Sequence, residues 1–328
     1  MKNPDWKFRG KVDEGGRGNS EVKRCQQLTH KGTKLKNLFE QIRMGYGQGY
    51  GCNYQPWLKI RRKNSSSKSN QVVAWMAPLG RSAHYFSRGE YQTALLLLWL
   101  GVDDLREQYP LWPISHPHPL AGASDLGLKE LPWMRGLMEI AREAGIDHGI
   151  EIGTDIPYVA TIDFLVTLHT VTGVKLVGIS CKPFSNPSIQ NRARSMERLE
   201  LERRYFEEIG ARYLVSNSGL VPNLMAGQLE WWMGSSILHN TELYQHSNCF
   251  AEFIEERESV SISEAIIEAS KYFEINLEDT WQLFRYCAWH QLIDIDPTER
   301  MVTSHPIYQG GRALRAALRE SLFGDDLI

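Results

Sequence analysis

The stretch YVATIDFLVTLHTVTGVKLVGISCK, residues 158–182, decides the fold class. Its two halves, 158–170 and 174–182, are both rich in β-branched residues, and Val171-Thr172-Gly173 separates them. This pattern is typical of two antiparallel strands joined by a hairpin. The sequence therefore predicts a sheet at the centre of the chain.

The hairpin also predicts which side chains come together. If the turn is centred between Thr172 and Gly173, directly paired residues have numbers that sum to 345, so Asp163 faces Lys182. Opposite residues share a face of a sheet, and alternate residues along a strand do so too. We therefore expect Asp163, Ser180 and Lys182 on one patch, which a one-residue slip would break up.

Elements on both sides of the hairpin complete an α/β pattern. Ser87-Arg88-Gly89-Glu90 is an S-x-x-E capping box before the apolar run 91–100, and it predicts the start of a buried helix. The other predicted elements are strands at 105–110 and 211–216 and helices at 131–144 and 194–209. This order predicts an α/β core with a mixed sheet over about 75–218.

From residue 219 the pattern becomes helical. The predicted helices are 223–233, 247–256, 263–273 and 277–292, followed by a strand pair at 293–307 that turns at 296–299. Short helices followed by a hairpin outline a winged helix. The helix at 277–292 offers few side chains that read DNA bases, Arg285 and His290 among them, so we expect this domain mainly to bind protein.

The charge is distributed unevenly along the 328 residues. Residues 1–70 hold 16 Lys and Arg against 5 Asp and Glu, a net of +11, and the whole-chain charge of −2 leaves −13 for the rest. A basic, glycine-rich segment with interspersed aromatics predicts a flexible arm that contacts phosphate, although a solubilising tail is an alternative. Arg61, Arg62, Lys63 and Arg88 are the candidate DNA contacts. We thus predict an arm at 1–70 and domains at 71–218 and 219–328.

Composition excludes several other classes of protein. Apolar residues make up 42% of the chain, which is ordinary for globular proteins. The longest apolar run, residues 94–102, is too short to span a bilayer, and residues 1–6 lack the apolar segment of a secretion signal. The five cysteines show no zinc or redox spacing. We expect a cytoplasmic protein.

Three charged residues form a candidate metal-dependent nuclease site. Asp163 and Lys182 on adjacent strands, with Glu90 on the preceding helix, match a D…(E/Q)xK arrangement. Carboxylates hold Mg²⁺, which polarises a phosphate and lowers the pKa of an attacking water, while the lysine stabilises charge. The alternatives are structural: Glu90 completes the capping box with Ser87, Asp163 and Lys182 form a cross-strand ion pair, and Ser180 is filler.

An ordered set of motifs covers about half of the chain. It consists of YQPWL (54–58), Glu90 in its apolar helix, LREQYPL (105–111), AGIDH (144–148), TIDFL (161–165), Lys182-Pro183 and RLELERRYF (198–206). Together they resemble the TnsA endonucleases of Tn-type cut-and-paste transposons. The resemblance implies a restriction-endonuclease-like domain with two Mg²⁺ ions, for which Mn²⁺ substitutes. It further implies that Glu90 and Asp163 are metal ligands and that Lys182 is the catalytic lysine.

Ser180 departs from the family pattern, which usually has Gln or Glu two residues before the lysine. A neutral hydroxyl is a poorer ligand for a cation than a carboxylate. A carboxylate from the following helix would complete the site, and Glu197 and Glu200 lie three residues apart on one face of that helix. We favour Glu200, with Ser180 in support; both glutamates could instead pair with Lys or Arg on a solvated face.

The resemblance also implies a role in transposition. Such an enzyme nicks the 5′ ends of the transposon, while a DDE transposase, TnsB, joins the 3′ ends and an AAA+ regulator, TnsC, binds the nuclease's C-terminal region. We predict an Mg²⁺-dependent endonuclease that acts on transposon-end DNA in the bacterial cytoplasm, at the nucleoid. The alternatives are a catalytically impaired adaptor that docks TnsB or TnsC, with Ser180 as the mark of lost chemistry, and a stand-alone restriction or repair nuclease.

Overall fold

The computed structural model describes residues 32–61, 70–121, 123, 131–171, 173–182, 189–217 and 219–324. The chain divides into two compact units, Met1–Met44 with Gly149–Tyr158, and Gly45–His148 with Val159–Ile328. In the first unit a helix covers residues 32–43, and Lys34 Nζ donates a hydrogen bond to the carbonyl of Ile152 at 2.9 Å. Every element described below belongs to the second unit.

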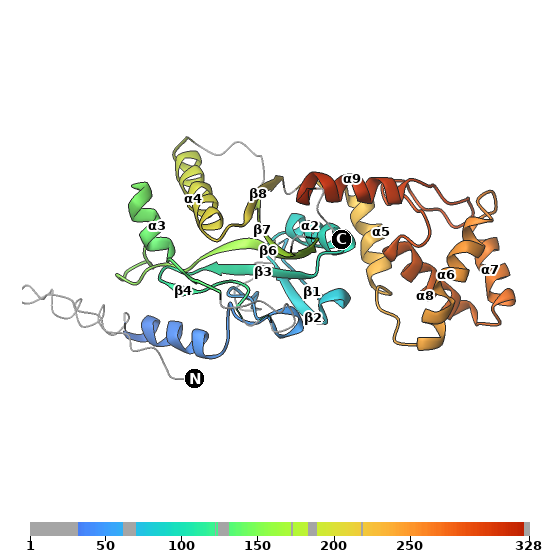
Figure 1. Ribbon diagram of the computed structural model, residues 1–328, viewed down its shortest axis with the longest axis horizontal. Coiled ribbons are helices and arrows are strands. Elements are labelled where there is room, and N and C mark those ends of the chain that lie inside the picture. Colours follow the sequence, from blue (N-terminus) through green and yellow to red (C-terminus); the bar gives the residue numbers. More distant parts are fainter. Residues whose placement is uncertain are drawn as a thin grey trace, which may run out of the picture. The chain divides into compact units, whose positions relative to one another are not determined.

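A four-stranded sheet forms the centre of the second unit (Figure 1). Its strands are β3 (Asp104–Leu111), β6 (Ala160–Thr170), β7 (Gly173–Lys182) and β8 (Arg212–Asn217), in the order β3-β6-β7-β8. β6 is antiparallel to β3 and to β7, whereas β8 is parallel to β7. The sheet is therefore mixed, and the predicted α/β class with a mixed sheet is confirmed.

The β6–β7 hairpin forms as predicted, but the predicted register was wrong by two residues. Pairing runs from Thr170↔Gly173 to Phe164↔Ile179, so paired numbers sum to 343. Gly173 takes a φ of 125°, which L side chains rarely adopt, and the hydroxyl of Thr170 donates to its carbonyl at 2.8 Å. The glycine thus begins the second strand instead of ending the turn. A shift of two preserves which side chains share a face.

Helices cover both faces of the sheet. α2 (Arg88–Trp99) is capped by Ser87, whose hydroxyl accepts from the backbone N–H of Glu90, as the S-x-x-E pattern predicted. Its leucines share an apolar core with Phe164 and Ile179, whereas α4 (Ile189–Glu208) packs Tyr205 and Phe206 in a second cluster that includes Leu165. Residues 164 and 165 are neighbours on one strand and point to opposite faces. α2 and α4 therefore approach the sheet from opposite sides.

α3 (Leu137–Ala144) ends at Gly145 as predicted, but it begins six residues later than expected. The residues before it form β5 (Trp133–Met134), which pairs with β4 (His116–Pro117). Gly136 then passes so close to the backbone of Ile114 that a Cβ would lie 2.2 Å from it. This tertiary contact, which periodicity does not reveal, shortens the helix.

The C-terminal part is helical. Its helices are α5 (Asn223–Met233), α6 (Thr241–Glu255), α7 (Ile262–Tyr272), α8 (Leu277–His290) and α9 (Gly311–Phe323); α5 to α8 gather together in Figure 1. The predicted strand pair at 293–307 was wrong, since this stretch contains no strand. Pro297 and Pro306 carry no N–H for a ladder, and Asp296 accepts from the backbone N–H of Thr298 in a local turn. The wing of the predicted winged helix does not form.

The segment before the sheet packs onto it. β1 (Val72–Met76) and β2 (Arg81–Tyr85) form an antiparallel ribbon joined by η2 (Ala77–Leu79). Upstream, after η1 (Gly51–Asn53), Tyr54 and Trp57 are buried, and the hydroxyl of Tyr54 donates to the carbonyl of Glu107 at 2.9 Å. Of the predicted arm, residues 1–31 and 62–69 lie outside the described residues. Within the described ranges no helix is long and apolar enough to cross a membrane.

Candidate active site

Glu90 is held at the start of α2, and its side chain is 7% exposed. Oε2 accepts hydrogen bonds from the backbone N–H of Phe86 at 2.9 Å and from Nε2 of Gln108 at 3.3 Å, while Oε1 accepts from the hydroxyl of Ser87 at 3.0 Å. Burial and the nearby Asp163 carboxylate raise the pKa of Glu90 to about 7. Glu90 is therefore tied to the residues that precede α2, with the backbone N–H of Phe86 in place of the Ser87 N–H of a full capping box, and also lies within the electrostatic field of Asp163.

Asp163 and Lys182 meet where β6 and β7 separate. The ladder of these strands ends at Phe164↔Ile179, and beyond it Asp163 Oδ2 accepts a hydrogen bond from the backbone N–H of Cys181 at 2.7 Å. Lys182 Nζ lies 3.5 Å from the same oxygen. Lys182 keeps 39% of its side chain exposed against 16% for Asp163. The lysine can thus reach an incoming molecule while it stays beside the carboxylate.

A second carboxylate reaches this place from α4. Glu202, 4% exposed, accepts a short hydrogen bond from the hydroxyl of Ser180 and another from the hydroxyl of Tyr213 at 2.8 Å. Burial raises the pKa of Glu202, the Lys182 ammonium opposes this rise, and Asp163 adds to it. Glu202 consequently belongs to the same electrostatic cluster as Asp163 and Lys182.

Gly178 explains how α4 comes close enough to place Glu202. A Cβ at Gly178 would lie 2.6 Å from ring atoms of Phe206, so the ring rests directly on the strand backbone. Gly178 and Ser180 are two residues apart on β7 and share a face, while Glu202 and Phe206 are one turn apart on α4. Because Gly178 has no side chain, α4 can lie close enough to β7 for Glu202 to contact Ser180.

The structure does not bring Glu197 or Glu200 into the cluster. Glu200 accepts hydrogen bonds from Arg203 and Arg204, which lower its pKa to about 2, and Glu197 pairs with Arg194 at 2.8 Å. Both lie on the solvated side of α4 and pair with arginines there, as the alternative to a metal-binding role predicted. The carboxylate that contacts Ser180 is instead that of Glu202.

The candidate DNA contacts lie at the surface or outside the described residues. Arg61 and Arg88 are both exposed, and Arg88 is the first residue of α2, two positions before Glu90. Arg62 and Lys63 lie outside the described residues. An exposed arginine this close to Glu90 is well placed to contact a phosphate.

The donor set fits Mg²⁺ in one of its common binding modes. Glu90 and Asp163 offer hard oxygen ligands, and the hydrogen bonds of Asp163 to described residues all use Oδ2, which leaves Oδ1 for a cation. Among the described residues no group of three or more His, Cys, Asp or Glu could hold a metal. Mg²⁺ is often bound through one or two carboxylates, with water and substrate phosphate supplying the rest. Burial raises the pKa of Glu90, and the nearby Asp163 carboxylate adds to the rise, so a cation bound beside them would favour the ionised form of Glu90.

Sequence reasoning missed two residues of the cluster, Glu202 and Gln108. Glu202 had a signal, because it lies three, four and seven residues before Tyr205, Phe206 and Ile209 on the buried stripe of α4. A carboxylate on an apolar stripe points inward. Gln108 had no such signal, since its part in the cluster depends on an irregular backbone within β3.

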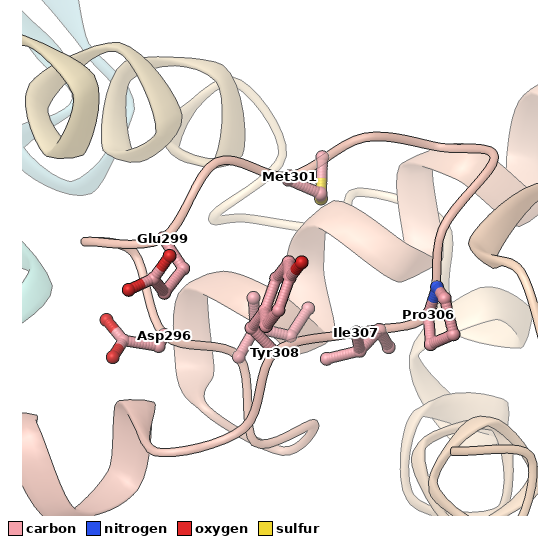
Figure 2. A pocket seen from close by; sticks show the side chains of 7 residues that line it. Asp296, Glu299, Met301, Pro306, Ile307 and Tyr308 are labelled. Carbon is pink, nitrogen blue, oxygen red and sulfur yellow. The ribbon is translucent and has the colours of Figure 1, made fainter. Parts of the chain in front are cut away.

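A pocket lies elsewhere, in the C-terminal helical part. Asp296 and Glu299 lie on one side of it and Pro306 on the other, with Tyr308 between them (Figure 2). Asp296 is already occupied by hydrogen bonds from the backbone N–H and the hydroxyl of Thr298. None of the cluster residues lines this pocket, so it does not alter the location of the candidate site.

The fold and the cluster together define a mixed α/β protein with a carboxylate–lysine site at the ends of two sheet strands. In sequence, the chain is similar to the transposon Tn7 transposition protein TnsA of Escherichia coli, with 30% identity over 195 residues. The similar part makes up 59% of this chain and 61% of TnsA, so the chain spans less than two thirds of that relative. No family model matches the chain. The similarity supports a TnsA-like transposition protein.

Proposed function

We propose that this chain is an Mg²⁺-dependent DNA endonuclease that cleaves the 5′, non-transferred strands at transposon ends as a subunit of a cut-and-paste transposase. The observation that carries the proposal is the cluster of Glu90, Asp163 and Lys182 at the strand ends, in a chain similar to a transposition protein. The choice of strand follows from the resemblance to the TnsA endonucleases. A restriction-endonuclease-like core, with the mixed sheet as its scaffold, is part of the proposal.

Each residue of the cluster would have a role that follows from its position. Glu90 and Asp163 would hold the metal from α2 and β6. When bound, Mg²⁺ would polarise the scissile phosphate and lower the pKa of the attacking water. Lys182, the most exposed of the three, would balance the charge that develops on the phosphate. Glu202 would fix Ser180 through its hydrogen bond and would place negative charge near Lys182.

The rest of the molecule supplies contacts to DNA and protein. Arg61 and Arg88, with Arg62 and Lys63, would contact the backbone of transposon-end DNA. Such contacts position a protein without reading sequence. The helical C-terminal part would dock the AAA+ regulator TnsC, and the complex would include the DDE transposase TnsB. Cleavage would then depend on assembly.

A reconstituted excision reaction with TnsB, TnsC and transposon-end DNA tests this proposal. Asp163→Ala should abolish 5′-strand cleavage while 3′-end joining continues, because the two strands are cut by different subunits. If the products are unchanged, the chain acts as an adaptor. If the wild-type chain cuts plasmid DNA with Mg²⁺ and no partner, it acts as a stand-alone nuclease. Either result would refute the proposal.

A further inference from the structure

Gln108 has a backbone conformation that its residue type does not favour. It lies inside β3 with a φ of +48°, and its side chain is 4% exposed. In the register of β3 with β6, Glu107 pairs with Phe164 and Tyr109 with Ile162, which puts Gln108 level with Asp163 but without a ladder pair. A left-handed residue of this kind inside a strand, buried and held by its surroundings, is characteristic of a functional constraint.

The side chain of Gln108 connects the two halves of the cluster. Its Nε2 donates to Glu90 Oε2 at 3.3 Å, and its Oε1 accepts from the hydroxyl of Thr161 at 3.1 Å. Its carbonyl accepts from the backbone N–H of Trp57 at 3.3 Å. The amide nitrogen faces Glu90 and the amide oxygen faces β6, which is the orientation that an ionised Glu90 requires, because an ionised carboxylate only accepts hydrogen bonds.

The other hydrogen bonds of Glu90 do not make this connection. Phe86 and Ser87 immediately precede α2 and fix the carboxylate only to its own helix. Among the described residues, the bond from Gln108 is the one that ties Glu90 to the sheet. Asp163 belongs to that sheet, as does Thr161, whose hydroxyl donates to the amide oxygen.

We propose that Gln108 is a positioning residue whose amide ties the Glu90 carboxylate of α2 to the strand that carries Asp163, so that both carboxylates would serve one divalent ion. This inference rests on the proposed function. The irregular backbone of β3 turns the side chain toward α2, and the amide links the two carboxylate-bearing elements. Loss of the amide should therefore weaken binding of the ion more than it weakens the fold.

Gln108→Met in the full-length chain tests the amide, because it keeps an unbranched side chain of similar length and removes both polar atoms. The matched control is Gln228→Met, which also removes a buried amide, one that donates at 2.7 Å to the carbonyls of Pro297 and Glu299 in the C-terminal part. The readouts are Mn²⁺ affinity, from the electron paramagnetic resonance signal of free Mn²⁺, and the thermal unfolding midpoint. Gln108→Met should lose about tenfold or more in Mn²⁺ affinity. Gln228→Met should lower the midpoint and bind Mn²⁺ as the wild type does.

Gln108→Asn keeps the inference testable if the methionine variant does not fold. Asparagine tolerates a left-handed backbone better than glutamine, so this variant should fold, but its amide is one methylene too short to reach Glu90. It should show the same loss of Mn²⁺ affinity. Suppose that every Gln108 variant that folds binds Mn²⁺ like the wild type, whereas Asp163→Ala binds it more weakly. The positioning role is then wrong, and the proposed function stands. If Asp163→Ala also binds like the wild type, the proposed function itself fails.

Discussion

Glu200 and Glu202 differ by two positions on α4 and by about 200° around its axis, at 3.6 residues per turn. We predict that Glu202→Gln lowers 5′-strand cleavage in the reconstituted reaction by at least about tenfold, roughly 1.4 kcal/mol, because it removes negative charge beside Ser180 and Lys182. Glu200→Gln is the matched control. It breaks only ion pairs at the surface, which contribute little to stability, and should leave the cleavage rate unchanged. Equal loss in both variants would remove Glu202 from the site.

The raised pKa of Glu90 predicts a pH-dependent stability in the presence of EDTA. With a folded pKa of about 7 against an ordinary 4.5, the folded chain binds more protons than the unfolded chain between these values. The free energy of unfolding should therefore fall as the pH rises from about 5 to 7, by about 2 kcal/mol. Urea unfolding at both ends of this range should show a smaller fall for Glu90→Gln. A fall of the same size in the variant would assign it to other groups.

At the scale of single elements, the sequence predicted those helices and strands whose ends depend on neighbouring residues in the chain. The S-x-x-E pattern located the start of α2, where Ser87 is the cap, and β-branched runs located β6 and β7. The register was wrong by two residues because it depends on how Gly173 closes the turn, but an even error preserves which residues of the two strands share a face. A sequence pattern thus locates a strand more reliably than it aligns one.

Elements that depend on distant contacts could not be predicted in the same way. The start of α3 is set by the approach of Gly136 to Ile114, and the strained conformation of Gln108 is set by its neighbours in space. α9 was not predicted, although its Leu314 and Leu318 pack against the apolar core from an otherwise arginine-rich helix. Glu202 was predictable in principle, since it shares the buried stripe of α4.

Gly178 provides a test of how β7 and α4 fit together. We predict that Gly178→Ala destabilises the chain by about 1–3 kcal/mol, because the new methyl group would overlap the ring of Phe206. The displaced helix should also carry Glu202 away from Ser180 and lower the cleavage rate. Gly145→Ala is the control for substitution at a glycine that has open space around it. It strains a left-handed residue at the end of α3 but should leave the cleavage rate unchanged. Urea unfolding and the excision reaction measure the two effects, and a normal cleavage rate in Gly178→Ala would contradict the proposed contact.

At the scale of the second unit, the C-terminal helices share their core with α2. One apolar cluster includes Leu95 to Leu98 of α2 together with Trp232, Phe284 and Phe323. Polar contacts reinforce it, since the hydroxyl of Tyr91 donates to Glu230 at 2.8 Å. The helix that carries Glu90 at one end is thus packed along its length against the part of the chain proposed to bind a regulator. A partner that shifts these helices would also act on α2.

Arginine side chains of α9 contact the C-terminal end of α2. Arg319 donates to the carbonyl of Leu100, the C-terminal cap of α2, and Arg315 donates to the carbonyl of His290 at 3.3 Å while its guanidinium lies over the ring of Trp99. Burial, with the neighbouring Arg319, lowers the pKa of Arg315 to about 10. These contacts place positive charge at the negative ends of two helix dipoles.

We predict that Arg319→Met loosens α2 without loosening α4. The substitution keeps an apolar stem and removes the charged donor at Leu100, a loss of about 1.5–3 kcal/mol for a hydrogen bond of this kind. Amide hydrogen exchange should therefore speed up along α2 and α9 by about tenfold or more, whereas α4, which packs on the opposite face of the sheet, should exchange at its wild-type rate. If exchange rises in α9 alone, α2 is not coupled to the C-terminal helices through this contact. In that case a regulator bound to those helices would need another route to Glu90.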